Sequence, residues 1–409
     1  MAFTPSASSY RKLFQENFLT IGNHYKLSFE IKSISAGSIA NFEPNSPSFN
    51  TIGVKTQIFT ATFDDLYLEP TTDANLTIDN ISIKEVTRDN VPRIDYSGGG
   101  CPHILAEPER TNLIPYSEDF TVGNWAKTRC TVTSNQAISP DGTLNADLMT
   151  STDDDARLGD QVGSSGAEYT QSIYVKSAQV SDVNCQIDFA GLNTVTFTAN
   201  QQWQRVETTL TDTSQSPRLR LRILNSGNSI YVWGAQLEEG SYATSYIPTD
   251  GGTVTRVKDQ FSRDGISSII NSEEGVLFVE MAALSDDLAY RRISINDSST
   301  SNRIGISYDD GSNRVRGQIV IGGVSIFLFF TSTDITQYSK IALKYKTNDF
   351  ALWVDGIERD TDTSAGVLPS NTLNNLSFDN GGGGNVFYGK VKQLQVYKTA
   401  NIDLAALTS

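Results

Sequence analysis

Apolar and polar residues alternate with a period of two along most of this 409-residue chain. The segment 218–223, RLRLRI, is the clearest case, with arginine at every even-numbered position and leucine or isoleucine at every odd-numbered position. Such alternation predicts half-buried antiparallel strands, because successive side chains of a strand point to opposite faces of the sheet. Residue pairs that favour tight turns interrupt the alternating runs at Asp310-Gly311, Gly322-Gly323 and Asp355-Gly356.

Helical patterns are few. Only 8–18 and 401–409 have a spacing of apolar residues that predicts short helices. From Gly275 onward, alternating segments recur about every 10–15 residues with turn residues between them, a pattern typical of a β-sandwich. The sequence therefore predicts an all-β protein.

An internal repeat divides the first 250 residues. Its three pairs of similar segments occur in the same order: 24–33 with 168–177, 56–63 with 194–203, and 76–86 with 230–240. The repeat predicts two homologous β-modules in tandem, the first of which lacks the strands expected before His24.

Connectors rich in Gly and Pro separate the expected modules. Residues 92–120 contain the triplet Gly98–Gly100 and four prolines. The alternating stretch that begins at Tyr231 likewise gives way to small polar residues, Pro and a Gly pair. The expected organisation is an incomplete attachment module 1–91, a linker 92–115, a complete module 116–250, a linker 251–272 and a C-terminal sandwich 273–409.

Charge and composition exclude several classes of protein. The net charge is −15 and the acidic residues are dispersed, which argues against binding nucleic acid, since a phosphate backbone needs a basic footprint. Three cysteines and two histidines at wide spacing support neither a zinc site nor a disulfide framework. The first residues contain no apolar core of a signal peptide, and no stretch approaches the ~18 apolar residues of a membrane helix.

Several motifs resemble those of bacteriophage virion proteins. ERTNLIPYSEDFTVGNWAKT, SPDGTLNADLM, YTQSIYVKS, WQRVETTLT and YVWGAQLEEGSYATSYIPTDGG keep the order found in a jelly roll, similar to carbohydrate-binding modules, of tail-fibre, head-fibre and decoration proteins. This resemblance covers about residues 92–259. KIALKYKTNDFALWVDGIE and GKVKQLQVYKTA are similar to the concanavalin A-like, or laminin G-like, sandwich that commonly follows it. The first 90 residues take part only through the internal repeat.

The resemblance implies tandem jelly-roll β-sandwich modules followed by a concanavalin A-like lectin domain. It implies a virion structural protein that is assembled in the host cytoplasm, mounted on the capsid, portal, tail or fibre subunits through its N-terminal region, and exposed on the virion surface. We expect multivalent, non-catalytic attachment to host-surface carbohydrate by a homo-oligomer, by analogy a trimer, with no membrane insertion. Two alternatives stay open: a purely structural decoration protein that binds other virion proteins, and a spike that depolymerises polysaccharide.

Catalytic motifs are absent from the sequence. The acidic clusters Asp153–Asp155, Asp286-Asp287 and Asp309-Asp310 have turn-like surroundings, and there is no GxSxG, HExxH or P-loop. We therefore assign no catalytic residue and expect no enzyme activity.

The resemblance also implies one structural calcium between the first and last strands of the jelly roll. Glu118 and Asp119 near one end, and Glu238 and Glu239 near the other, have suitable oxygen ligands. The sequence pattern fits ordinary surface carboxylates equally well, and we therefore assign no metal ligand. We expect no other cofactor.

Glycan binding needs exposed aromatic rings beside planar hydrogen-bonding groups. Trp125 in a predicted loop, Tyr290 with Arg291 and Arg292, and Tyr308 beside two aspartates lie near expected strand ends and are the candidate ligand-binding residues.

Other aromatic and basic residues are weaker candidates. Trp203, Trp233 and Trp353 lie inside alternating segments and are expected in cores, and the arginine stripe of segment 218–223 is expected to be a solvated face, although it is suited to an acidic glycan or an acidic neighbouring subunit.

Overall fold

The computed structural model describes residues 2–3, 12–41, 48–85, 93–96, 101–161, 165–212, 214–363, 366 and 368–409. Strands make up 55% of the chain and helix 1%, which confirms the all-β prediction. One short helix, α1 (Leu404–Thr408), lies within the segment 401–409 that predicted it. The prediction of a helix over 8–18 is wrong for the residues that the structure describes, because Leu13–Gln15 form strand β2. Residues 8–11 lie outside the described part. No helix among the described residues has the length and apolarity to cross a membrane.

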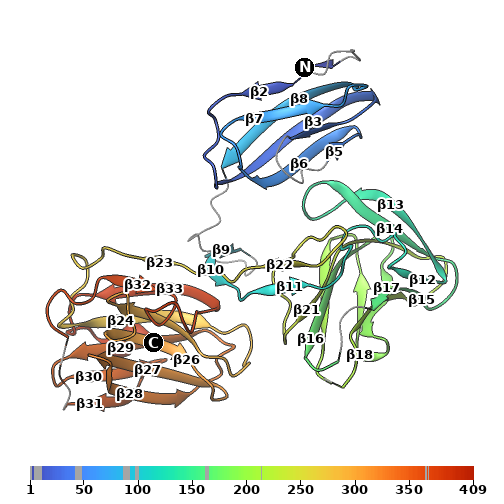
Figure 1. Ribbon diagram of the computed structural model, residues 1–409. Helices are drawn as coiled ribbons and strands as arrows, with labels where there is room; N and C mark the ends of the chain where they lie inside the picture. The colour runs from blue at the N-terminus through green and yellow to red at the C-terminus, as the bar shows by residue number, and fades with distance from the viewer. Residues whose placement is uncertain are drawn as a thin grey trace. The chain divides into compact units, whose positions relative to one another are not determined.

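The chain divides into two compact units, Met1–Val91 and Pro92–Ser409. The first is a sandwich of two four-stranded sheets, blue in Figure 1. Leu27, Phe29 and Ile31 of β3 are almost fully buried, as the period-two pattern requires. One sheet has the order β1 (Ala2–Phe3), β8 (Asn75–Glu85), β3 (His24–Ala36) and β6 (Gly53–Thr60), and the other the order β2, β7 (Leu66–Pro70), β4 (Ile39–Asn41) and β5 (Ser48–Phe49).

The second unit contains a jelly-roll sandwich of two five-stranded antiparallel sheets. Leu219, Leu221 and Ile223 of β20 point into the core between them, whereas the arginines of the same strand point outward. One sheet has the order β12 (Ala126–Thr128), β15 (Ala156–Gln161), β20 (Arg218–Ile223), β17 (Val183–Phe189), β18 (Leu192–Ala199). The other has the order β13 (Cys130–Ile138), β14 (Leu144–Ser151), β21 (Ser229–Glu239), β16 (Tyr169–Ser177), β19 (Gln204–Leu210).

The internal repeat corresponds to equivalent strands in two of its three pairs. In the first unit β3 lies between β8 and β6, and in the jelly roll β16 lies between β21 and β19. The pairs 24–33 with 168–177 and 76–86 with 230–240 therefore match in position. The middle pair does not, because β6 pairs with β3 whereas β18, which contains most of 194–203, lies in the opposite sheet from β16.

The C-terminal sandwich, mostly orange to red in Figure 1, has a seven-stranded and a six-stranded antiparallel sheet. The seven-stranded sheet has the order β31 (Ile357–Asp362), β30 (Phe350–Val354), β29 (Ser339–Lys346), β24 (Glu274–Ala282), β33 (Gly389–Tyr397), β10 (His103–Ala106), β9 (Arg93–Asp95). The six-stranded sheet has the order β23 (Ser262–Arg263), β32 (Asn375–Ser377), β25 (Arg291–Asn296), β26 (Arg303–Tyr308), β27 (Arg314–Ile321), β28 (Val324–Ser332).

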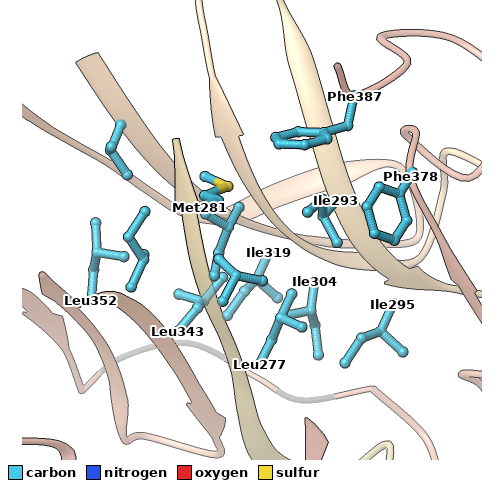
Figure 2. Packing of buried hydrophobic residues seen from close by; sticks show 14 of the residues in the cluster. Leu277, Met281, Ile293, Ile295, Ile304, Ile319, Leu343, Leu352, Phe378 and Phe387 are labelled. Carbon is cyan, nitrogen blue, oxygen red and sulfur yellow. The ribbon is translucent and has the colours of Figure 1, made fainter. Parts of the chain in front are cut away.

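The core of this sandwich fixes which side chains face outward. Figure 2 shows Ile293, Ile304 and Ile319 of the six-stranded sheet packed close to Leu277 and Leu343 of the other sheet. Full burial of such a side chain contributes about 1.5–3 kcal/mol. Because each isoleucine points inward, its neighbours along the strand must point to the opposite, outer face. The candidate site described below lies on this outer face.

The segment 92–115, which was expected to be a linker, contains regular secondary structure. It contains β9 and β10, and β10 pairs with β33 at the edge of the C-terminal sandwich. Further along, β11 (Arg110–Asn112) pairs with β22 (Val254–Arg256), which lies in the other predicted linker. An edge strand leaves backbone donors and acceptors unpaired, and the added strands satisfy them.

Two of the three predicted tight turns are confirmed. Gly322 and Gly323 have φ of 57° and 83°, and Asp355 and Gly356 have φ of 51° and 77°. Positive φ at both central residues matches the right-handed twist of a two-residue hairpin. The turn at Asp310-Gly311 is longer, and its residue with positive φ is Asn313 (52°).

Candidate functional site

Three neighbouring strands of the six-stranded sheet bring polar side chains together on its outer face. Arg292 of β25 is opposite Ser307 of β26, and Ser307 is opposite Arg316 of β27. Two residues further along, Gln318 is opposite Gly305, and Arg303 begins β26. Residues that share a row or lie two apart on one face are close neighbours. The register therefore gathers three arginines and a glutamine on one patch.

The outer face holds a pocket of about 450 Å³. This is within the range of small-ligand sites, roughly 300–1,000 Å³. Its lining is polar and contains no acidic residue among those described: Tyr290, Arg292, Thr300, Arg303, Arg316, Gln318, Val320, Gly323, Ser325, Asn380 and Asn385. We call this the arginine pocket.

A glycine-rich segment, 380–385, supplies one side of the arginine pocket. The Ser294 hydroxyl, on the outer face of β25, donates to the Asp379 carbonyl (2.7 Å). Gly381 has φ 85°, and a Cβ there would lie 2.3 Å from the Ser299 carbonyl oxygen. Glycine is needed for this close approach. The segment thereby places the amides of Asn380 and Asn385 at the pocket.

Arg292 lines the arginine pocket and is buried, with 2% of its surface exposed. No described residue forms a hydrogen bond or an ion pair with its side chain, and its Nε is a buried donor without an acceptor. Gly305 leaves room for it, since a Cβ there would lie 2.9 Å from Arg292 Cδ. A buried guanidinium without a partner is costly to the fold.

Polar neighbours hold the other two arginines in place. Arg316 donates to the Tyr290 hydroxyl, and its guanidinium lies 5.4 Å from the centre of the Tyr290 ring. Arg303 donates to the Thr300 carbonyl and to Gln318 Oε1 (3.3 Å). Both arginines keep an Nε without an acceptor among the described residues.

The arginine pocket carries the positive charge of three arginines, and no acidic residue among its described lining residues offsets that charge. Burial, together with the charges of Arg303 and Arg316, lowers the pKa of Arg292 to about 10. Burial, and then the charge of Arg316, also lowers the pKa of Arg303. Arg292 remains protonated at neutral pH, because a pKa of about 10 lies well above 7. An anion with several oxygen acceptors would provide the missing partners.

Of the predicted ligand-binding residues, the structure brings Tyr290 and Arg292 together at the arginine pocket. Arg291 points the other way, because adjacent residues of a strand face opposite sides. It is fully buried, forms an ion pair with Asp287 and lies 4.3 Å from the centre of the Tyr388 ring.

Trp125 and Tyr308 are buried, and the expectation that they present rings to a ligand is wrong. Trp125 is 2% exposed, packs against Phe120 and donates its Nε1 hydrogen to the Tyr116 carbonyl (2.9 Å). Tyr308 is 1% exposed and belongs to the core of the C-terminal sandwich. A sugar needs an accessible ring face, which neither residue offers.

Sequence reasoning missed Arg303, Arg316 and Gln318. The signal was present, because the segments 303–308 and 314–320 alternate polar and apolar residues in the same way as 291–296. What the sequence did not reveal is that these three strands are adjacent and in this register.

The remaining aromatic and basic candidates are at least partly buried or are paired with other protein groups. Trp233 is buried, whereas Trp203 and Trp353 are half-buried. The stripe on β20 is largely paired: Arg220 forms an ion pair with buried Asp188, and Arg222 forms one with Asp155. These ion pairs leave the outward face of β20 with little free positive charge.

A second pocket, of about 390 Å³, lies in the jelly roll and is lined by Glu118, Asp119, Asp147 and Asp250 among other residues. Burial raises the pKa of Glu118 and of Asp147. Asp147 already accepts the backbone amides of Phe120 and Asn135 (both 2.9 Å).

The residues considered for calcium are not brought together as a set. Glu238 is fully buried and accepts from the amide and the hydroxyl of Thr244, whereas Glu239 is exposed. Within the described ranges, no group of three or more His, Cys, Asp or Glu side chains is arranged to hold a metal ion.

No family model matches the chain, and no curated protein is similar to it at a significant level. Solved structures give distant likenesses. The carbohydrate-binding module CBM40 of the Ruminococcus gnavus IT-sialidase, solved with alpha2,6 sialyllactose, is 15% identical over 36% of this chain and 98% of its own, with a TM-score of 0.30. Domains LG4-5 of the mouse laminin alpha1 chain are 9% identical over 76% and 92%, with a TM-score of 0.25. The LG1-3 region of a laminin alpha2 chain is 7% identical over 95% and 96%, with a TM-score of 0.24.

Proposed function

We propose that this chain is a non-catalytic, lectin-like protein that binds glycans in the arginine pocket. The observation that carries the proposal is the lining of that pocket: guanidinium, amide and hydroxyl groups beside the ring of Tyr290, on the open face of a β-sandwich. Sugars present rows of hydroxyl groups and flat apolar faces. Planar side chains with fixed hydrogen-bonding directions, next to an aromatic ring, suit both.

The biological setting that we propose is the surface of a bacteriophage virion. This assignment rests on the resemblance of the sequence motifs to virion proteins, with the N-terminal region bound to other virion proteins and the sandwiches carrying the attachment function. An open pocket of this size gives a weak site. Many copies on one particle raise the overall avidity about 10²–10⁴-fold, which makes weak attachment to a host-surface glycan effective.

A glycan array probed with the full chain tests the binding function. We expect binding to a defined set of glycans, lost in Tyr290→Ala and retained in Tyr96→Ala, which removes a 72% exposed tyrosine outside the arginine pocket. A silent array, together with capture of a capsid or tail protein by the full chain, would favour the purely structural role instead.

An enzymatic role has one specific observation in its favour, the acidic pocket of the jelly roll. A carboxyl group with a raised pKa beside an ionised one is the arrangement that glycosidases use. Glu118 is the candidate acid, since Asp147 is occupied by backbone amides. If the full chain releases reducing ends from host polysaccharide, and Glu118→Gln abolishes the release while Glu239→Gln does not, the chain is a depolymerase and the non-catalytic assignment is wrong.

A further inference from the structure

We propose that the arginine pocket selects an anionic sugar, one that carries a carboxylate or a sulfate ester, and seats the anionic group among Arg292, Arg303 and Arg316. This inference rests on the proposed glycan-binding function and narrows it to a class of ligand.

The first step is the balance of charge. The chain carries a net charge of −15, yet the arginine pocket has three guanidinium groups and no carboxylate in its lining. No ion pair joins any of the three to an acidic residue of the described part. Elsewhere in unit Pro92–Ser409, the half-buried Arg220 is paired with Asp188, and the fully buried Arg291 is paired with Asp287. The pocket is therefore a local departure from how this protein otherwise neutralises buried arginines.

The second step is the burial of the unpaired group. Arg292 has only 2% of its surface exposed, and its side chain has no hydrogen-bonding or ion-pair partner in the part of the chain that the structure describes. Such a group is strongly destabilising unless a partner arrives. Because Arg292 lines the pocket, a ligand reaches it without any rearrangement of the sheet.

The third step is preorganisation. The contacts of Arg316 with Tyr290, and of Arg303 with the Thr300 carbonyl and Gln318, hold both side chains before any ligand binds. Gln318 is itself held by the Ser325 hydroxyl, to which its Nε2 donates (3.1 Å). Guanidinium groups fixed in place match the two oxygens of a carboxylate or the three terminal oxygens of a sulfate ester.

The fourth step is the sugar that carries the anion. Beyond the three arginines, the lining offers the hydroxyls of Ser325 and Tyr290 and the amides of Asn380 and Asn385. These uncharged groups suit sugar hydroxyls. A volume of about 450 Å³ has room for a monosaccharide ring as well as its anionic substituent.

The test compares matched ligands on the full chain. Isothermal titration with oligosaccharides that contain uronic acid is paired with the same oligosaccharides after reduction of the carboxyl groups, and a sulfated oligosaccharide is paired with its desulfated form. We expect at least tenfold weaker binding of each neutral form. We also expect at least tenfold weaker binding of the anionic forms by Arg292→Gln and by Arg316→Gln. Arg263→Gln, which changes an exposed arginine of β23 outside the pocket, should bind as the unaltered chain does.

Thermal unfolding controls for misfolding. Arg292→Gln removes a buried charge without a partner, so its melting temperature should equal or exceed that of the unaltered chain. If it fails to fold, Arg316→Gln, whose side chain is only half-buried, still decides the question.

The possible outcomes separate the two proposals. Equal affinity for neutral and anionic forms overturns the anionic inference and leaves the glycan-binding function in place. A silent array rejects the glycan-binding function. In that case stabilisation of the chain by inorganic sulfate, absent from Arg292→Gln, would still support an anion site, and no stabilisation by sulfate would overturn it as well.

Discussion

At the scale of single residues, the same residue type has opposite roles on the two faces of one strand. Arg291 and Arg292 are neighbours on β25, and both are buried. Arg291 has Asp287 and the Tyr388 ring as partners, and so it stabilises the sandwich. Arg292 has none among the described residues, and in our proposal a ligand supplies the partner that is missing.

Gly305 provides a test of how closely the arginine pocket is fitted. A methyl group there would lie 2.9 Å from Arg292 Cδ, so Gly305→Ala should displace the guanidinium while its φ, which is not in the left-handed region, causes no backbone strain. We expect several-fold weaker binding of the anionic oligosaccharide by titration and a change of under about 1 kcal/mol in the free energy of unfolding. Gly252→Ala, at a glycine with nothing within 4 Å, is the control. Unchanged affinity in Gly305→Ala would mean that the position of Arg292 does not matter to binding.

The lowered pKa of Arg292 predicts how binding depends on pH. Its charge is complete well below its pKa of about 10 and is lost as the pH rises through that value. Affinity for the anionic oligosaccharide should therefore be constant between roughly pH 6 and pH 8.5 and should fall above about pH 10. Arg292→Gln should lack the fall. A decline near pH 6.5, measured by the same titrations, would point to histidine and against this assignment.

At the scale of elements, short turns set the pairing of the strands that build the site. The hairpins at Gly322-Gly323 and Asp355-Gly356 need positive φ at both central residues. They fix how β27 pairs with β28 and how β30 pairs with β31. A slip of one residue would exchange the inner and outer faces of a strand. The position of Arg316 on the outer face therefore depends on the correct pairing of β27 with its neighbours.

Gly356 tests the importance of turn conformation. Its φ of 77° is unfavourable for a residue with a Cβ, so Gly356→Ala should lower the free energy of unfolding by about 1–2 kcal/mol. Asp355→Asn is the matched variant, because asparagine tolerates positive φ and keeps the oxygen that accepts the Lys340 amide (2.8 Å). Chemical denaturation of both variants measures the difference, and equal stability would show that the turn contributes little.

At the scale of the whole molecule, each of the two units has its own hydrophobic core. Leu27, Phe29 and Ile31 contribute to the core of Met1–Val91. Both sandwiches of Pro92–Ser409 have separate cores, and the first of them lacks the arginine pocket. The pocket is formed entirely by residues 290–385.

This division predicts that residues 92–409 retain glycan binding when they are produced without the first unit. The monovalent affinity should agree with that of the full chain within about twofold, because no described residue of Met1–Val91 lines the arginine pocket. Titration in solution, where avidity does not contribute, is the measurement. A loss of tenfold or more would show that the first unit takes part in binding.

Much of the fold and a part of the site were open to prediction from sequence. Alternation predicted the strands and their inward and outward residues, and glycine-containing pairs predicted the hairpins, because side-chain direction and turn conformation depend on a few adjacent residues. Tyr290 and Arg292, which line the arginine pocket, were selected from the sequence because they lie near a strand end. Trp125 and Tyr308 were misjudged because burial depends on what packs over a ring, which local pattern does not reveal.

The sequence by itself determined that the chain forms the strands of β-sandwiches with alternating inward and outward side chains, since apolar and polar residues alternate along it. Only the tertiary structure decided that β25, β26 and β27 lie side by side in a register that gathers Arg292, Arg303 and Arg316, and that β9 and β10 extend the sheet of a domain that begins far along the chain. The physical reason is that strand neighbours and register arise from backbone hydrogen bonds between distant segments, which are selected by the packing of the whole core.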